Sequence, residues 1–173
     1  MGVEVRRATR DDIPALAVLQ QAVAGELKWI AARPGVDLAE VEAWFETVLE
    51  AERRVVFVVP SERSVDAMLT IEAAPYGVAD FGMFVRDTER GKGLGAALVA
   101  TAIEWAREQG AHKISLECWP HNTAAIALYE KHGFVIEGRK RRHYRRGGGD
   151  AAWDSLIMGL LLDPDIPGSP YGD

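Results

Sequence analysis

Residues 90–95, Arg-Gly-Lys-Gly-Leu-Gly, place three glycines in five positions between two segments of different periodicity. The apolar run 81–85 before them is typical of a strand, and the stretch after them repeats apolar residues at helical spacing. Bare backbone in such a turn can approach a ligand closely. The unpaired N–H groups and the dipole of the following helix favour an anion, most often a phosphate. The turn therefore predicts a phosphate-bearing ligand, with Arg90 and Lys92 as additional cations.

The rest of the chain predicts an alternation of helices and strands. Thr9 and Asp12 form a capping box before a helix that runs to about Ala24, and Asp37 caps a second helix. The expected strands cover residues 3–5, 55–59, 67–71, 79–86, 113–118, 135–144 and 153–161, and two further helices end at Gly110 and Gly133. The resulting order, β-α-α-β-β-β-α-β-α-β-β, predicts an α+β or α/β sheet with helices on both faces.

Length and composition narrow the class of protein. With 173 residues we expect one domain over 1–163, followed by a mobile, Pro/Gly-rich tail over 164–173. The net charge of -6 argues against nucleic-acid binding, although the basic run Arg139–Arg146 could attract an anionic partner. No apolar run is long enough to span a membrane, so we expect no membrane partner. A single cysteine, Cys118, fits the reducing cytosol, and we therefore expect a cytoplasmic protein.

Two other phosphate-binding motifs compete with this interpretation of the turn. Gly91-x-Gly93-x-x-Ala96, with Glu117 about 20 residues further on, matches the dinucleotide-binding fingerprint. That fold needs several further βαβ units of roughly 30 residues each. Only 56 residues follow Glu117, and they hold one short helix and two strands. A P-loop is excluded because no Gly-Lys-Ser/Thr sequence is present.

The segment 122–134, Asn-Thr-Ala-Ala-Ile-Ala-Leu-Tyr-Glu-Lys-His-Gly-Phe, supplies a second motif in the order that another family requires. Together with Arg90-x-x-Gly93-x-Gly95, it resembles the GCN5-related N-acetyltransferase (GNAT) superfamily. The resemblance is specific over about residues 80–134, and residues 1–75 match only in element order. It implies a mixed central sheet of about seven strands whose central parallel strands splay apart.

The resemblance implies an acetyl-CoA-dependent N-acetyltransferase. The acetyl group would move to an amine of a small metabolite by direct attack in a ternary complex. The alternatives are a protein acetyltransferase, acting on an N-terminal amine or a lysine, and a non-catalytic CoA-binding module. No metal is expected, because the histidines lack the spacing of metal ligands. Dimers are common in the family, although no residue pattern in this chain specifies a homodimer.

The resemblance also assigns cofactor contacts. The pyrophosphate of acetyl-CoA would lie on the backbone of the glycine turn, and the pantetheine arm would run beside the strand that precedes it. Asn122 would contact the arm or cap its own helix. The implied cofactor-binding set is Met83, Phe84, Val85, Arg90, Gly91, Lys92, Gly93, Leu94, Gly95, Ala96 and Asn122.

The catalytic candidates are fewer. Tyr129 occupies the position at which the family places the acid that protonates the departing thiolate, and the alternative is a core aromatic on its helix. Asp80 or Glu72 is favoured as the general base, with Glu117 as a third candidate at a neighbouring strand end. In the family, the regions of Trp29 and Trp119 line the acceptor pocket. A covalent route through Cys118 is less favoured, because a free cysteine is usually a small buried residue.

Overall fold

The computed structural model describes residues 2–62, 64–145 and 151–170. The helices are α1 (Ile13–Gly25), α2 (Leu38–Glu50), α3 (Leu94–Glu108) and α4 (Thr123–Lys131). The strands are β1 (Arg6–Arg7), β2 (Arg54–Ser61), β3 (Ser64–Ala74), β4 (Val78–Val85), β5 (Lys113–Cys118), β6 (Val135–Arg145) and β7 (Ala152–Leu161). The predicted element order is confirmed. The first strand lies at Arg6–Arg7 rather than at residues 3–5, because Arg6 and Arg7 are the residues that pair in register with Val58 and Phe57 of β2.

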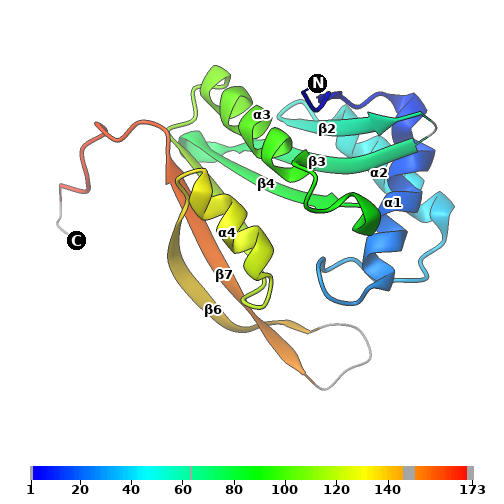
Figure 1. The fold of residues 1–173 in the computed structure, drawn as a ribbon. Helices are drawn as coiled ribbons and strands as arrows, with labels where there is room; N and C mark the ends of the chain where they lie inside the picture. Colours follow the sequence, from blue (N-terminus) through cyan, green and yellow to red (C-terminus); the bar gives the residue numbers. More distant parts are fainter. Residues whose placement is uncertain (1, 63, 146–150, 171–173) are drawn as a thin grey trace.

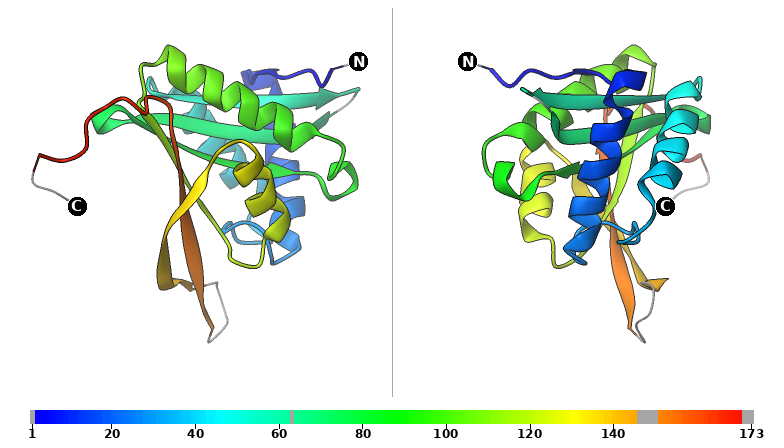
Figure 2. Two further views of the ribbon diagram at one scale, coloured as in Figure 1. Left: turned by 60° about the vertical axis from the view of Figure 1, so that its left-hand side comes forward. Right: turned by 90° about the vertical axis from the view of Figure 1, so that its right-hand side faces the viewer.

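The strands form one seven-stranded sheet in the order β1-β2-β3-β4-β5-β7-β6. Every neighbouring pair is antiparallel except the central pair, β4 and β5, which is parallel. The long β6–β7 hairpin extends beyond the rest of the molecule (Figure 2). The mixed sheet of seven strands predicted from the resemblance is therefore confirmed.

Helices cover both faces of the sheet (Figure 1). On one face, α3 and α4 pack over a core that contains Phe81, Leu98 and Phe134. On the other face, α1 and α2 pack over a second core that contains Leu16 and Phe45. Because side chains alternate along a strand, consecutive residues of β4 serve opposite cores.

The central parallel strands pair over a short distance and then diverge. Their register ends at Asp80 opposite Ser115, whereas β4 continues to Val85 and β5 to Cys118. In Figure 1, β4 and the β7–β6 pair run in clearly different directions from this point. The predicted splay is thus present, and it opens the sheet on the side where β4 leads into the glycine turn.

The predicted caps hold the helices in place. Asp37 accepts a hydrogen bond from Ala39 N at 2.8 Å at the start of α2. Asn122 accepts one from Ala125 N at 3.2 Å at the start of α4. The backbone N–H of Thr9 donates to Asp12 Oδ2 at 2.8 Å, as the capping box requires. These bonds satisfy N–H groups that a helix start leaves without an intrahelical partner.

Parts of the sequence prediction remain untested. Three consecutive glycines, Gly147–Gly149, separate the last two predicted strands and predict a turn between them. These glycines and the last residue of the basic run, Arg146, lie outside the described residues. Residues 164–170 are exposed and contain neither helix nor strand. A single domain over 1–163 and a mobile tail after it stay predictions. None of the helices in the described part of the chain is long and apolar enough to cross a membrane.

Candidate active site

A cavity of about 420 Å³ lies between the glycine turn, the end of β4 and α4, and we call it the turn cavity. Ten of the eleven residues predicted to bind the cofactor line it, and Lys92 is the exception. Asn122 both lines the cavity and caps α4, so its two predicted roles are compatible. The end of β4, the glycine turn and the start of α4, each predicted to contact the cofactor, therefore surround one cavity.

The backbone of the turn presents the start of α3 to this cavity. Gly93 precedes the helix with φ of +89°, a left-handed conformation that glycine adopts without strain. The first i→i−4 bond runs from Ala97 N to Gly93 O at 3.1 Å, so the preceding N–H groups have no partner inside the helix. At Gly95, an added Cβ would lie 3.1 Å from Leu128 Cδ2 and 3.3 Å from Met83 Cε. The turn is thus suited to an anion. A side chain at Gly95 would require Leu128 and Met83 to shift by a few tenths of an ångström.

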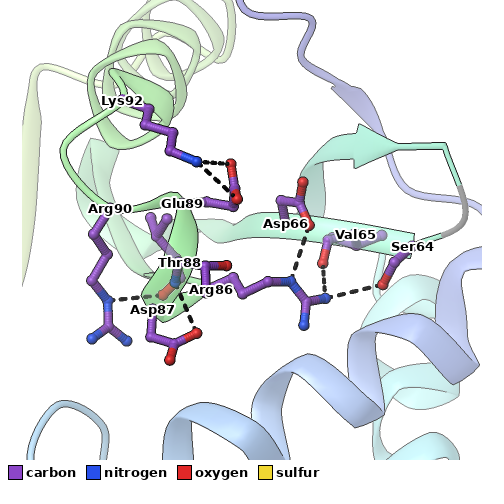
Figure 3. Close-up of polar contacts among 10 residues, drawn as sticks. Ser64, Val65, Asp66, Arg86, Asp87, Thr88, Glu89, Arg90 and Lys92 are labelled. Atoms are coloured by element: carbon purple, nitrogen blue, oxygen red, sulfur yellow. Dashed lines mark hydrogen bonds and ion pairs between the residues drawn. The ribbon is translucent and has the colours of Figure 1, made fainter.

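Both cations of the turn are paired with carboxylates. Lys92 Nζ lies 3.0 Å from Glu89 Oε1, and it points in a different direction from Arg90 (Figure 3). Arg90 Nε donates to Val85 O at 3.1 Å, and its Nη1 donates to Glu26 Oε2 at 2.7 Å. Recognition of an anion by the turn therefore depends on backbone N–H groups more than on these two side chains.

A second cavity, of about 240 Å³, lies beside the first, and we call it the aromatic cavity. Its lining comes from the α1–α2 connection, α2, β3, β4, the end of β5, the β5–α4 connection, α4, β6 and β7. Glu117 is the one charged side chain among the described residues that line it. The residues that line both cavities are Trp29, Ile30, Met83, Phe84, Asn122 and Tyr129. The two cavities therefore meet at the splay between β4 and β5.

Tyr129 lies at this junction and is only 6% exposed. Its ring contacts Phe81 and Phe134, with centroid distances of 5.8 and 5.9 Å. Burial raises the pKa of the Tyr129 hydroxyl well above its usual value. The phenol therefore keeps its proton at neutral pH, as a residue that acts as an acid must.

The predicted bases form a row of carboxylates on the α1–α2 face of the sheet. Glu72 of β3 lies directly opposite Asp80 of β4, and Arg54 pairs with Glu72. Asp80 keeps access to solvent, yet partial burial raises the pKa of its carboxyl to about 6, and the charges of Glu117 and Glu72 act in the same direction. Neither Asp80 nor Glu72 lines a cavity; Gly82, two residues along the same face of β4, does.

Glu117 is held more firmly than the other two carboxylates. It accepts hydrogen bonds from Lys140 Nζ, from Ser155 Oγ at 2.7 Å and from Tyr144 Oη at 3.2 Å. Burial raises the pKa of the Glu117 carboxyl, but these donors, led by Lys140, outweigh it and the net shift is downward. Glu117 is therefore a fixed negative charge rather than a proton acceptor near neutral pH.

Aromatic rings from distant segments surround the second cavity. Trp119 is 6% exposed and stands edge-on to Tyr144 and Trp153, with centroids 5.0 and 5.5 Å away. Its plane is nearly parallel to the His121 ring, which lies 6.0 Å from Trp29. Trp29 and Trp119, both predicted for the acceptor region, line this cavity together with further residues that the sequence did not single out as acceptor contacts. Those additional residues include Trp44, Met68, Thr70, Tyr144 and Ser155.

Cys118 also lines the aromatic cavity, but its chemistry is poor for a nucleophile. The residue is buried, and burial raises the pKa of the thiol to about 11. Because the thiolate is the nucleophilic form, the Cys118 thiol is inert near neutral pH. This disfavours a covalent acetyl-cysteine and favours direct transfer.

Two other features of the sequence acquire a local role. Within the predicted basic run, Lys140 binds Glu117, and Arg139 Nε donates to Asp154 at 2.6 Å. Lys140 therefore holds a side chain of the aromatic cavity in place, and Arg139 links β6 to β7 within the hairpin. Among the residues that the structure describes, no group of three His, Cys, Asp or Glu side chains could hold a metal ion.

Comparison with known proteins agrees with this geometry. The model of the acetyltransferase (GNAT) family matches residues 26–134. The L-methionine sulfoximine/L-methionine sulfone acetyltransferase of Pseudomonas aeruginosa is 30% identical over 172 residues, which cover 95% of this chain and 97% of that protein. The match therefore includes both the glycine turn and the N-terminal helices.

Solved structures show the same fold. The ribosomal-protein-alanine N-acetyltransferase of Brucella melitensis superposes with a TM-score of 0.81 at 27% identity, over 92% of this chain and 99% of that one. The structure of yncA from Salmonella typhimurium, determined with its cofactor acetyl-CoA, gives a TM-score of 0.81 at 21% identity over 98% of this chain and 99% of that one.

Proposed function

Because the chain belongs to the acetyltransferase (GNAT) family, we propose that it transfers an acetyl group from acetyl-CoA to the primary amine of a small metabolite. The observation that carries the proposal is the meeting of two chemically different cavities at Tyr129. One cavity has a backbone anion site, and the other has aromatic walls and a carboxylate. Donor and acceptor would occupy them together, in a ternary complex.

The turn cavity fits acetyl-CoA. Backbone N–H groups at residues 91–96 would hold the pyrophosphate at the start of α3. The β5-facing edge of Met83–Val85, left free by the splay, would hold the pantetheine arm as an additional strand. Acetyl-CoA supplies the thioester, whose acyl carbon bonds to the amine nitrogen as the C–S bond breaks.

The carboxylates would prepare the acceptor. An alkyl ammonium has a pKa of roughly 10.4, so it must lose a proton before it can attack. Glu117, whose carboxylate is already paired with Lys140, would accept a hydrogen bond from the ammonium form. Asp80, with a pKa of about 6, is ionised at neutral pH and would take the proton through a water at the rim of the cavity. Glu72 is the weaker candidate for the base because its carboxylate already forms an ion pair with Arg54.

Tyr129 would complete the proton balance at the junction. Its buried hydroxyl retains its proton at neutral pH, and it lies where the departing sulfur would gain negative charge. Proton transfer of this type contributes typically about 10²–10⁴-fold. We expect a contribution from Tyr129 near the lower end of this range, because a thiol of pKa about 8.5 is already a good leaving group.

The aromatic cavity supports a compact acceptor. A volume of about 240 Å³ is below the usual range of drug-sized ligand pockets, which begins at about 300 Å³. Its wall combines tryptophan rings with the thioethers of Met68 and Met83, surfaces that suit an apolar or sulfur-containing side chain. The Pseudomonas aeruginosa relative is named for methionine sulfoximine and methionine sulfone. We therefore propose an amino-acid derivative of that size and polarity as the acceptor.

An amine panel with acetyl-CoA, read by thiol release, tests the proposal. The panel should contain methionine sulfoximine, methionine sulfone, other amino acids, aminoglycosides, polyamines, and peptides with free N-termini or lysines. We expect turnover with compact amino-acid derivatives. Turnover restricted to peptides would favour a protein acetyltransferase, and acetyl-CoA binding without turnover of any amine would favour a CoA-binding module.

A further inference from the structure

Residues 26–30, which we call the strap, form the first part of the connection between α1 and α2, and they lie at the boundary between the two cavities. Trp29 and Ile30, near its end, line both of them. Leu27 adopts a left-handed conformation with φ of +60°, which is unfavourable for a residue with a branched side chain. A strained conformation persists only where surrounding contacts hold it, so the anchors of the strap decide where Trp29 lies.

The anchor on the turn side is a three-residue cluster. Glu26 Oε2 accepts from Arg90 Nη1 at 2.7 Å and from Trp29 Nε1 at 2.6 Å, and Glu26 Oε1 accepts from Arg90 Nη2. The guanidinium carbon of Arg90 also lies 5.6 Å from the centroid of the Trp29 ring. Because Arg90 forms both contacts, one side chain fixes the carboxylate and the indole relative to the glycine turn.

The anchor on the other side comes from the β5–α4 connection. His121 Nε2 lies 2.9 Å from the carbonyl oxygen of Lys28, and its ring stands against Trp29 and Trp119. The strap is thus fastened to both sides of the splay, once by the turn that faces the donor and once by the loop that faces the acceptor.

The pairing of Arg90 affects what the turn can offer an anion. Hydrogen bonds from Arg90, opposed by burial, lower the pKa of Glu26, so the carboxylate stays charged at neutral pH. The guanidinium charge is therefore largely neutralised in place. This leaves Arg90 better suited to holding the strap than to binding a phosphate.

We propose that Glu26 is a positioning residue for the acceptor, which acts by fixing Trp29 against Arg90. The inference depends on the proposed function, because it assigns the aromatic cavity to the acceptor. It separates two roles within one motif: the backbone of the glycine turn serves the donor, while the side chain of its first residue serves the acceptor through the strap.

The variant Glu26→Gln tests this directly. It keeps the shape of the side chain and removes the charge that binds Arg90. We expect the acceptor KM to rise roughly fivefold, as for loss of a charge-assisted pair that is partly exposed, with acetyl-CoA affinity and kcat within about twofold. Glu50→Gln, which removes a more exposed pair with Arg10 outside the lining of both cavities, should change none of these constants.

Two further measurements make the result decisive. Trp29→Phe should raise the acceptor KM by itself, and the double variant should be no worse than the stronger single variant, because both act through one contact. Hydrogen exchange of the strap amides should be faster in Glu26→Gln than in the wild type, with the amides of residues 91–96 unchanged.

Hydrogen exchange requires no turnover, so it separates this inference from the proposed function. Unchanged exchange in the strap would overturn the inference even if the enzyme is active. An unchanged acceptor KM, or a change confined to acetyl-CoA affinity, would also overturn it. Absence of turnover in the wild type with every amine would instead remove the proposed function.

Discussion

The turn cavity and the aromatic cavity share a boundary but differ in the residues that line them and in the chain segments that supply those residues. The turn cavity combines the glycine-rich backbone of the turn with apolar side chains, and most of its lining comes from one stretch of the chain, residues 83–96. The aromatic cavity presents mainly large side chains, and they come from eight separate stretches of the chain. Backbone recognition depends on conformation, so it tolerates changes of side chain. Side-chain recognition depends on residue identity, so single substitutions can change the acceptor while the donor site stays intact.

The largest effect should come from the junction, where the two cavities depend on the same residue. Tyr129→Phe removes the buried hydroxyl without changing the ring, and we expect kcat to fall roughly 10²-fold with acetyl-CoA KM near the wild-type value. Tyr144→Phe is the control, because it removes a hydroxyl that donates only to Glu117 and should cost much less. An unchanged kcat at saturating substrates, with chemistry rate-limiting, would leave Tyr129 as a core aromatic.

The next effect should appear in the pH dependence. The Asp80 carboxyl has its pKa raised to about 6, above its ordinary value, so it gains the charge of a base only as the pH rises through about 6. We expect kcat/KM to fall below that pH in the wild type. Asp80→Asn should lower kcat/KM at neutral pH by at least about tenfold and abolish the fall of kcat/KM below about pH 6. Glu72→Gln should keep the fall of kcat/KM below about pH 6. If that fall disappears in Glu72→Gln, Glu72 is the base instead.

A smaller effect, confined to the donor, should follow a change of backbone conformation. Gly93→Val introduces a branched side chain at a left-handed position, which costs about 1–2 kcal/mol. If the turn relaxes to escape this strain, acetyl-CoA affinity should fall roughly tenfold while the acceptor KM changes little. Gly110→Val creates the same conflict at φ of +72° after α3, away from both cavities. Equal losses of affinity in the two variants would point to general destabilisation.

The smallest effect should be confined to the acceptor. Trp44 lines the aromatic cavity and is 47% exposed, so its removal should disturb folding little. Trp44→Ala should raise the acceptor KM about threefold, which corresponds to roughly 0.7 kcal/mol, with acetyl-CoA KM unchanged. Tyr76→Ala, which removes an exposed ring outside both cavities, is the control. An effect on acetyl-CoA alone would contradict the separation of the two cavities.

The same difference in construction explains what could be predicted from the sequence. The glycine turn, its helix and the α4 segment are local patterns, and their periodicity, caps and motif spacing were sufficient to predict ten residues that line the turn cavity. Lys92 was the exception, because the direction of its side chain is set by its pair with Glu89 rather than by the turn.

The aromatic cavity could be predicted only in part. Trp44, Tyr144 and Ser155 come together through strand order and through irregular register in β6, neither of which has a local signature. The pair between Glu26 and Arg90 joins residues 64 positions apart. Charge states also depend on the assembled neighbours, as the opposite shifts of the Asp80 and Glu117 pKa values illustrate.

The divergence of β4 from β5 leaves the sheet with an interior gap. Within the described chain, residues 81–85 pair with β3 on one side and with no strand on the other. A ligand that occupies that edge would complete the sheet. Because it would bind the folded chain and not the unfolded one, it would raise the free energy of unfolding by an amount that grows with its concentration. The thermal stability of this protein should then rise with the concentration of free acetyl-CoA, and its lifetime in a cell would report the supply of that metabolite.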